Sequence, residues 1–393
     1  MFKAVFKLFF REIKLITTEH SLLLTLLGAP LLYAFMYGSI YINKVEENIG
    51  LAVIDEDRTE LSKKLIDEIS SDPMINTIPT IDLNAAQELM YRGKTEGYLY
   101  IEKDFEKKVL ALKQANITLA VNASRFLPAS DLTAHITSIS LTVGGGVRKI
   151  YFNKQGMNDQ QAMANTMPIQ LNFKPLYNET TGYGSFLLPG LMAIILQQTL
   201  LIGLCLSMTM ERKDRKLGEL KNISINNVSV LLTGKGLFYY LSFMIFSQFF
   251  FLIAFSIFNM PFRGSLFEVN LLMTIFFITL IPMGFLIGSF MKNPILTMQL
   301  LGFSSYPIFL ITGYSMPFGS LPTAIQMISN LLPTTPFLRI YTMIVQGGAS
   351  ISDLGRPLIH LGALTLFYTI AFVIRLKYLY KKQEQRTAET AIE

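Results

Sequence analysis

The sequence predicts an α-helical membrane protein that crosses the bilayer six times, with an α/β domain inserted after the first span. Three observations lead to this fold class. Of the 393 residues, 51% are hydrophobic and only 16% are charged, whereas an ordinary soluble domain has about 25% charged residues. Long runs without a charge alternate with charged segments, and one segment of globular composition separates the first run from the second. Basic residues gather beside alternate ends of these runs.

The uncharged runs give the spanning helices. A helix needs about 20 mostly apolar residues to cross a hydrocarbon core about 30 Å thick. The first run is too long for a cleavable signal peptide, and no small-residue cleavage site follows it. The predicted spans are residues 21–43, 184–208, 233–258, 269–291, 295–315 and 357–376.

Residues 317–350 are apolar but are interrupted by proline and glycine. Non-helical backbone persists at membrane depth only where protein or a water-filled cavity covers it. We therefore expect two short helices, 321–332 and 335–346, that enter the outer leaflet and return. One more full span is the alternative, and it would put the two chain ends on opposite sides. Arg339 is expected at the outer rim, paired with Asp353.

The orientation follows from lysine and arginine near the span ends, because cytoplasmic flanks carry an excess of them. One side holds Lys3, Lys7, Arg11, Lys14, Arg212, Lys213, Arg215, Lys216, Lys221, Lys235, Lys292, Arg375, Lys377, Lys381, Lys382 and Arg386. The short loops opposite hold only Arg263, Arg339 and Arg356. Both termini are therefore expected in the cytoplasm, with residues 377–393 as a cytoplasmic tail and residues 44–183 outside. The net charge of +6 thus reflects topology, and no nucleic-acid partner is expected.

Residues 1–20 are expected to form an amphipathic helix in the plane of the membrane surface. Lys3, Lys7, Arg11 and Lys14 lie on one helical stripe, and phenylalanine, valine and isoleucine cover most of the remainder. Such a helix can rest on anionic membrane lipid through its basic face. Glu12 falls outside the pattern. Ordinary flanking charge is the alternative interpretation.

Residues 44–183 have a near balance of acidic and basic residues and are numerous enough to bury a core. Short apolar runs alternate with amphipathic ones, which favours an α/β domain with a small, partly parallel sheet. The predicted extended segments are residues 51–54, 75–81, 97–101 and 117–121, and the predicted helices are residues 60–69, 85–91, 105–112 and 130–153.

Motifs for catalysis, metal binding and nucleotide binding are not found in the sequence. The single cysteine, Cys205, excludes an internal disulfide and a cysteine-based zinc site. Gly93-Lys94-Thr95 matches the end of a phosphate-binding loop, but Glu88 stands where the motif needs its first glycine. The predicted spans contain no Asp or Glu as an ion relay, and His360 is interpreted as a packing residue. We expect no cofactor bound by this chain.

Polar side chains inside the predicted spans need partners in apolar surroundings. They are candidates for a substrate path, with helix–helix hydrogen bonding as the alternative interpretation. These residues are Gln197, Gln198, Gln248, Gln299, Ser304 and Ser305.

Four stretches of the sequence resemble the permease subunit of bacterial type-2 ATP-binding-cassette (ABC) exporters that carry a large outer domain between spans one and two. The stretches lie along nearly the whole chain. They are Leu51-Ala-Val-Ile-Asp-Glu-Asp57; Gly97-Tyr-Leu-Tyr-Ile101 with Asp104-Phe105; Leu176-Tyr-Asn178 with Phe186-Leu-Leu-Pro-Gly190; and Asn330-Leu-Leu-Pro333 with Thr335-Pro336, Arg339 and Gly347-Gly348.

The resemblance implies a coupling helix within residues 210–225 that docks on a separate ATPase, and an outer gate near the re-entrant helices. The coupling residues would be Glu211, Arg212, Arg215, Leu217, Leu220 and Ile223, and the gate residues Asn330, Pro333, Pro336 and Arg339. Leu217, Leu220 and Ile223 would form an apolar face that inserts into a groove. ATP and Mg would be bound by the ATPase.

The resemblance also implies a function and partners. The chain would be the non-catalytic permease of an exporter in the bacterial inner membrane, moving a hydrophobic or amphipathic drug, lipid or peptide. Two ATPase subunits, a second permease copy or a paralogue, and a periplasmic adaptor would be its partners. A membrane-anchored sensor or assembly scaffold, whose outer domain binds a ligand, is the alternative. No acid–base or nucleophile constellation in the spans supports an intramembrane enzyme.

Overall fold

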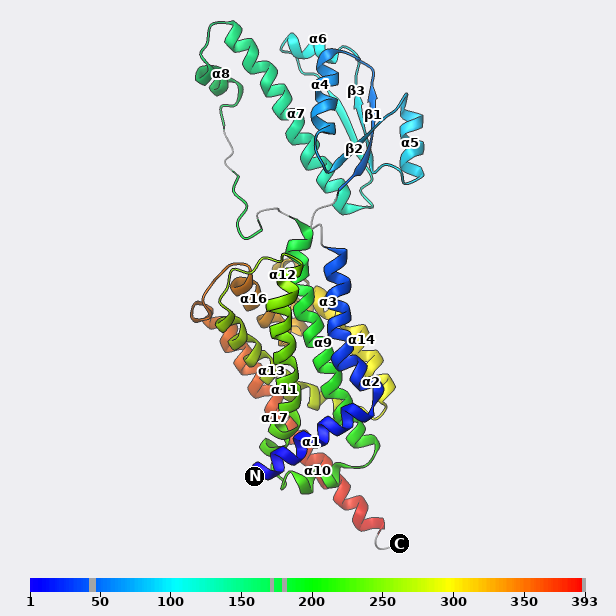
Figure 1. The fold of residues 1–393 in the computed structure, drawn as a ribbon, viewed down its shortest axis with the longest axis vertical. Helices are drawn as coiled ribbons and strands as arrows, with labels where there is room; N and C mark the ends of the chain where they lie inside the picture. Colours follow the sequence, from blue (N-terminus) through cyan, green and yellow to red (C-terminus); the bar gives the residue numbers. More distant parts are fainter. Residues whose placement is uncertain (42–46, 170–172, 179–181, 391–393) are drawn as a thin grey trace. The chain divides into compact units, whose positions relative to one another are not determined.

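The computed structural model describes residues 1–41, 47–169, 173–178 and 182–390. The chain divides into two compact units (Figure 1). Unit 1 comprises Met1–Lys44 and Pro175–Glu393, and unit 2 comprises Val45–Lys174. Several predicted boundaries, namely residues 43 and 44 and the end of the tail at 391–393, lie outside the described residues.

Unit 1 is helical. Its first part contains α1 (Phe2–Thr18), α2 (His20–Leu23), a π-helical turn (Leu24–Gly28) and α3 (Ala29–Ile40). After unit 2 follow α9 (Tyr183–Lys213), α10 (Leu217–Ile223), α11 (Val228–Phe249), a second π-helical turn (Phe250–Ala254), α12 (Phe255–Ile257), α13 (Leu266–Gly288), α14 (Pro294–Ile311), α15 (Thr323–Asn330), α16 (Thr334–Val345) and α17 (Gly355–Thr390). Short 3-10 turns lie at Phe318–Ser320 and Ile351–Asp353.

Five helical segments among the described residues are long and apolar enough to cross a membrane. They are Tyr183–Lys213, Val228–Ile257, Leu266–Gly288, Pro294–Ile311 and Gly355–Gln385. The run expected as the first span contains a shorter apolar helix, Leu24–Ile40. The chain leaves the helical conformation at Glu19, before α2. The two short helices expected at 321–332 and 335–346 are α15 and α16.

Helix α9 forms the centre of unit 1. The apolar stretch of α9 is 94% buried, whereas those of α14 and α17 are only 17% buried. Glycines on α13 let it approach α9 closely: a Cβ added at Gly288 would lie 2.4 Å from the carbonyl oxygen of Cys205. Helix α9 is therefore enclosed by other helices of the chain, whereas α14 and α17 leave broad apolar surfaces exposed.

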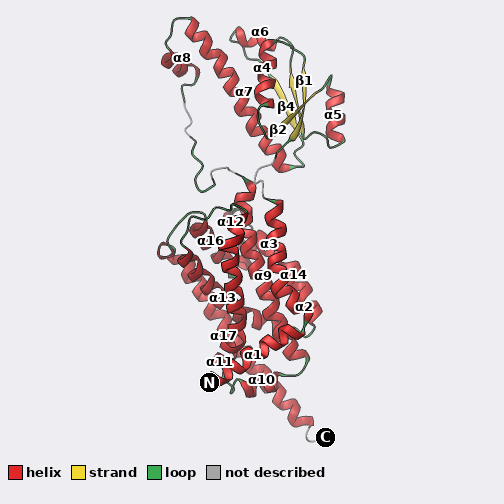
Figure 2. Cartoon of the chain, viewed as in Figure 1, coloured by secondary structure: helices red, strands yellow, loops and turns green. Residues whose placement is uncertain are grey.

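Unit 2 is built on a four-stranded sheet (Figure 2). The strands are β1 (Ile49–Asp55), β2 (Ile75–Pro79), β3 (Gly97–Ile101) and β4 (Ile117–Val121), in the order β2-β1-β3-β4. Strand β1 pairs in parallel with β2 and β3, and β4 pairs antiparallel with β3. The helices are α4 (Glu60–Ser70), α5 (Leu83–Tyr91), α6 (Phe105–Leu110), α7 (Phe126–Lys154) and α8 (Asp159–Thr166).

Helices cover both faces of this sheet. Leu51, Val53 and Leu99 pack on one face against α4, α6 and α7, while Ala52 and Ile54 pack on the other against α5. Because successive side chains of a strand point to opposite faces, the unbroken apolar run of β1 is buried on both sides.

The carboxylate of Asp57 joins the end of β1 to α6. It accepts hydrogen bonds from the backbone N–H groups of Phe105 (3.1 Å) and Glu106 (2.9 Å) and from the hydroxyl of Thr59 (2.7 Å). Burial acts to raise the pKa of Asp57, but these hydrogen bonds favour the charged form and hold the pKa below its ordinary value.

Candidate functional site

The first helix of the chain packs across one end of unit 1. Figure 1 shows α1 and α10 at the same end as the last turns of α17, and we call this the terminal end. Ala4, Leu8, Glu12 and Ile16 recur every four residues and are all buried, so they form one face of α1. That face packs on α11, where Gly234 has no side chain: a Cβ there would lie 2.7 Å from Cβ of Leu8.

The other faces of α1 are exposed. Phe2, Phe6 and Phe10 are 78%, 41% and 62% exposed, and Lys3 and Lys7 are exposed beside them. An apolar stripe beside a basic one suits the headgroup region of a membrane. Glu12, which the sequence placed outside the amphipathic pattern, belongs to the face that packs on the protein.

A buried lysine and a buried glutamate meet under α1. Lys235 of α11 and Glu12 are both fully buried and form an ion pair. Lys235 Nζ also donates to Oε1 of Glu211 on α9 at 2.9 Å. The Oε2 atom of Glu12 accepts from the hydroxyls of Ser207 (2.8 Å) and Tyr239 (3.2 Å). Both oxygens of the Glu12 carboxylate are thus satisfied, as a buried charge requires.

Arg11 connects this cluster to α10. Its guanidinium forms a two-bond ion pair with Glu211, with Nη2 donating to Oε2 at 2.9 Å. Its Nε lies 3.6 Å from Oε1 of Glu219 on α10. Arg11, Glu12, Ser207, Glu211, Lys235 and Tyr239 together form what we call the base network. It contains two carboxylates and two cations, so it is neutral, and removing Lys235 leaves the buried carboxylate of Glu12 without a cation.

Helix α10 is held by three other helices. Leu217 and Leu220 are 8% and 0% exposed and belong to the core of unit 1, and α10 contacts α1, α9 and α17. Lys221 forms an ion pair with Glu384 of α17 and lies 5.8 Å from the ring centre of Tyr380. A displacement of α10 must therefore move these helices or break buried contacts.

The connection between α13 and α14 is tied to the same end. Arg212 of α9 donates to the carbonyl of Met291 at 2.7 Å. Arg375 of α17 donates to the carbonyl of Ser289 at 3.3 Å and lies 4.2 Å from the ring centre of Phe290. The terminal end thus joins α1, α9, α10, α11, α13 and α17 through charged side chains.

In the described parts of the chain, no group of three or more His, Cys, Asp and Glu side chains could hold a metal ion. The base network is closed on itself and buried. It can transmit force between helices, but it offers no open position to a substrate.

The comparisons with known proteins agree with a transport role. The profile of the family described as "ABC-2 family transporter protein" matches residues 20–374. The chain belongs to this ABC-2 transporter family. It is 23% identical over 335 residues to the "Probable multidrug ABC transporter permease YbhS" of Escherichia coli strain K12, covering 84% of each chain. The YbhS permease of Escherichia coli O157:H7 matches equally.

The structure places the coupling residues of this ABC-2 permease unexpectedly. The apolar face of α10, expected to dock in a groove of the ATPase, is packed inside the permease through Leu217 and Leu220. Ile223 is partly buried against the same core. This corrects the interpretation of the apolar face, because an amphipathic helix can equally pack inward. Glu211 is in the base network, Arg212 binds the α13–α14 connection, and only Arg215 is exposed.

The polar residues expected along a substrate path of the ABC-2 permease do not share one surface. Gln198 of α9 donates to the carbonyl of Leu301 on α14 and lies 3.4 Å from the hydroxyl of Ser304. Gln197 is buried nearby, and its Oε1 has no hydrogen-bond partner among the described residues. Gln299 is exposed on α14, and Ser305 is half-buried there. Gln248 pairs elsewhere, with Asn270 of α13.

The expected gate residues lie at the opposite end of unit 1, which we call the insert end because α3 ends and α9 begins there. The carbonyl of Asn330 accepts a hydrogen bond from Nε2 of His360 at 2.8 Å. Pro333 directly precedes α16, and Pro336 is buried in its first turn. Arg339 is exposed. The expected pairing of Arg339 with Asp353 is wrong, because no ion pair joins them in the described structure.

Sequence reasoning missed the base network. Lys235 was counted among the flanking charges, but α11 begins at Val228, so Lys235 lies two turns inside the helix and is buried. The spacing of Glu12 indicates its burial, because Glu12 follows Ala4 and Leu8 at intervals of four residues and precedes Ile16 by four. That periodicity marks a buried stripe.

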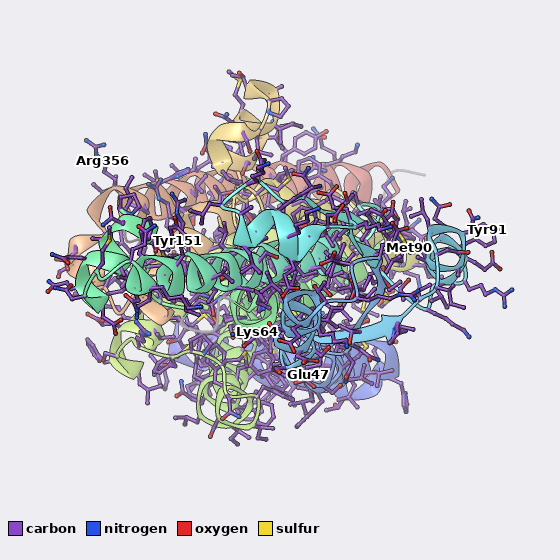
Figure 3. All side chains as sticks on the ribbon, turned by 90° about the horizontal axis from the view of Figure 1, so that it is seen from above. Glu47, Lys64, Met90, Tyr91, Tyr151 and Arg356 are labelled. Atoms are coloured by element: carbon purple, nitrogen blue, oxygen red, sulfur yellow. The ribbon has the colours of Figure 1, made fainter. Side chains whose placement is uncertain are left out.

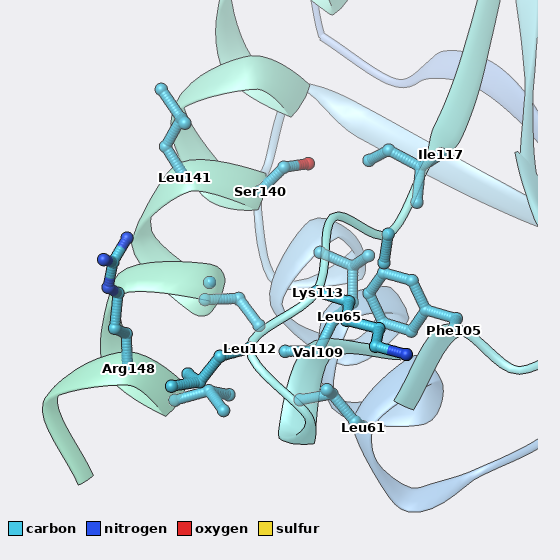
Figure 4. Close-up of a pocket in the computed structure, with 14 residues that line it drawn as sticks. Leu61, Leu65, Phe105, Val109, Leu112, Lys113, Ile117, Ser140, Leu141 and Arg148 are labelled. Atoms are coloured by element: carbon cyan, nitrogen blue, oxygen red, sulfur yellow. The ribbon is translucent and has the colours of Figure 1, made fainter. Parts of the chain in front are cut away.

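Unit 2 has a cavity of about 380 Å³ between α4, α6 and α7 (Figure 4). Leu61, Leu65, Phe105 and Val109 line its apolar side. The side chain of Ser140 points into it from α7 (Figure 4). Asp55, Glu56 and Asp57, at and after the end of β1, do not line this cavity.

Proposed function

We propose that this chain is the membrane-spanning permease of an ATP-driven exporter, in which a separate ATPase moves α10 and the base network carries the movement into the spans. The observation that carries the proposal is the chain of contacts from Glu219 through Arg11 to Glu211, Lys235 and Glu12. It links one exposed residue of α10 to buried residues of α1, α9 and α11.

The distribution of charge supports placing the terminal end in the cytoplasm. Lysine and arginine cluster on the segments that meet there, and an ATPase needs cytoplasmic ATP. Unit 2 then lies outside the membrane on the other side, as expected for an insert between the first two spans. The bacterial inner membrane suits this arrangement and an ATPase partner.

The surface that α10 offers to an ATPase is polar. Lys213, Asp214, Arg215 and Lys216 are exposed in the turn before α10, and the side chain of Glu219 is 55% exposed. We propose that these groups, with Leu217 and Leu220 holding α10 in place, form the docking surface. Charged rims of this kind set partner choice and register.

A second permease copy, or a paralogue, suits the exposed side of α14. Phe303 and Tyr306 are 82% and 67% exposed, and Gln299 is exposed on the same helix. Gly302 has no atom within 4 Å of where its Cβ would lie. Exposed amide and small residues in a spanning helix favour a neighbouring helix over lipid.

The substrate that we propose is hydrophobic or amphipathic. The YbhS relatives are named as multidrug permeases. In this chain, the pair formed by Gln198 and Ser304 places polar groups between α9 and α14. Two copies would enclose a path beside these helices. A periplasmic adaptor would meet unit 2.

The experiment is co-purification of the full chain with a candidate ATPase, followed by ATPase and efflux assays. Lys213→Glu combined with Arg215→Glu should reduce co-purification by about tenfold or more, as charge reversal does in an electrostatic interface. Lys292→Glu is the matched control, because Lys292 is exposed on the α13–α14 connection at the same end. Equal recovery of the ATPase by all variants, with unchanged efflux, would contradict the proposed docking surface.

A ligand-sensing role is the second candidate, and the cavity of unit 2 is the observation that favours it (Figure 4). A sensor would keep its response when every ATPase is absent. Ligand-dependent signalling by cells that lack the partner ATPase would therefore favour the sensor over the exporter.

A further inference from the structure

A cavity of about 620 Å³ opens at the insert end of unit 1. Five segments line it: the start of α9, the turn after α14, the end of α15, helix α16 and the first turns of α17. The lining residues include Phe318, Leu338, Arg339, Met343, Arg356 and His360.

The charged residues of this cavity all have one sign. Arg339 of α16 and Arg356 of α17 line it, and no aspartate or glutamate is among the described lining residues. Neither arginine forms an ion pair with another described residue. Arg356 is exposed, and in Figure 3 its labelled side chain extends away from the ribbon at the edge of the view.

The helices add to this positive potential. Arg356 and His360 are one turn apart on α17, and both lie within its first two turns. The N-terminal end of a helix carries a partial positive charge. The Nε2 atom of His360 donates to the carbonyl of Asn330 at 2.8 Å, which fixes the ring beside the cavity. Arg356 is near the start of α17 and Arg339 is in the middle of α16; two guanidinium groups that line one cavity can bind an anion through charge-assisted hydrogen bonds.

The rest of the cavity is suited to hydrocarbon. Phe318, Leu338 and Met343 line it, and the neighbouring α17 exposes Ile359 (73%) and Leu366 (62%). Arginine in a membrane segment is costly unless it reaches the headgroup region or finds a partner there. An anion that carries a hydrocarbon chain would satisfy the arginines and cover the apolar wall together.

We propose that this cavity binds the phosphate headgroup of an anionic lipid, with Arg339 and Arg356 on the phosphate and the acyl chain along Phe318, Leu338 and Met343. Arginine matches phosphate through paired hydrogen bonds, whereas lysine acts as a point charge. This site is a property of the chain itself. It does not depend on the ATPase or on the direction of transport.

The test is fluorescence anisotropy with the purified full chain in a nonionic detergent. The probes are a short-chain phosphatidylglycerol and a short-chain phosphatidylcholine that carry the same fluorophore. We expect the wild type to prefer phosphatidylglycerol, and Arg339→Gln with Arg356→Gln to weaken that binding by roughly tenfold to a hundredfold, as for lost charge-assisted hydrogen bonds. Arg263→Gln is the control, because Arg263 lies in a loop at the same end but does not line the cavity.

Competition separates the two sources of a phosphate group. Inorganic phosphate that displaces the probe as well as unlabelled phosphatidylglycerol would support the anion site but assign it to free phosphate. Displacement by phosphatidylglycerol alone supports the lipid site.

Equal binding of both probes by the wild type would overturn the proposal, as would an unchanged preference in the double glutamine variant. Thermal unfolding checks that this variant is folded. Arg339→Lys with Arg356→Lys keeps both charges and should retain part of the preference for phosphatidylglycerol. If the double glutamine variant does not fold, this lysine variant tests the proposal in its place, and binding of both probes equally well by the wild type still refutes it.

Discussion

The base network makes a quantitative prediction about Lys235. In Lys235→Met, Glu12 loses its only cation and keeps the hydroxyls of Ser207 and Tyr239, while Glu211 keeps Arg11. Removing one partner of a buried ion pair costs about 3–5 kcal/mol. Because about 1 kcal/mol shifts the melting temperature of a 150–250-residue unit by roughly 2–4 °C, we expect a fall of roughly 6–20 °C.

The companion variants separate the charge from the packing. In Glu12→Gln, Lys235 still has Glu211 at 2.9 Å, so the loss should be smaller, about 1–3 kcal/mol. The double variant Glu12→Gln, Lys235→Met leaves no unpaired charge under α1. It should therefore be more stable than the sum of the two single losses by roughly 0.5–3 kcal/mol.

The assay is thermal unfolding of the purified protein in detergent, followed by loss of the monodisperse peak in size-exclusion chromatography. Lys7→Met is the control, because Lys7 is exposed on the same helix as Glu12. A Lys235→Met variant that melts with the wild type would refute the reasoning. Strict additivity in the double variant would show that the two residues do not act as a pair.

Three further substitutions test other parts of the fold. Asp57→Asn should weaken the start of α6 by about 0.5–2 kcal/mol and speed amide hydrogen exchange there. Because folding lowers the pKa of Asp57, its carboxylate contributes its full stabilisation above the unfolded pKa near 3.9 and loses it as the pH falls through the folded pKa. Amide exchange at the start of α6 in the wild type should therefore rise only below about pH 4. Gly288→Ala should destabilise unit 1 by roughly 1–3 kcal/mol in thermal unfolding, because its Cβ would lie 2.4 Å from a carbonyl of α9, whereas Gly302→Ala, with nothing within 4 Å, should melt with the wild type. Leu220→Asp places a carboxylate at a fully buried position and should abolish recovery of folded protein. Normal expression of this variant with loss of ATPase binding alone would instead indicate that the apolar face of α10 docks in a groove of the ATPase.

Much of the fold could be predicted because it depends on features that are local in sequence. An uncharged run of more than 20 residues has few alternatives to a spanning helix. Prolines at 317, 322, 333 and 336 predicted that the long apolar stretch would break into short helices, and α15 and α16 lie there. In unit 2, the short apolar run at residues 51–54 predicted a strand, and β1 lies there.

The site could not be predicted to the same extent, because it depends on which faces of helices meet. Lys235 and Glu12 are 223 positions apart, and neither residue by itself indicates its partner. The sequence predicted an apolar face on α10 that includes Leu217 and Leu220. Periodicity does not tell whether such a face packs on the same chain or on a partner. Only the packing of α1 and α17 around α10 decides this.

The most direct test of the account severs the link between α10 and the base network. Arg11→Gln removes the contact to Glu219 but leaves Glu211 paired with Lys235, so the fold should persist. In liposomes that contain the permease with its ATPase, ATP hydrolysis should continue while transport per ATP falls by roughly 5- to 150-fold, the range of a typical coupling energy. Lys7→Gln should leave the ratio at the wild-type value. An Arg11→Gln complex that transports as much substrate per ATP as the wild type would contradict the account.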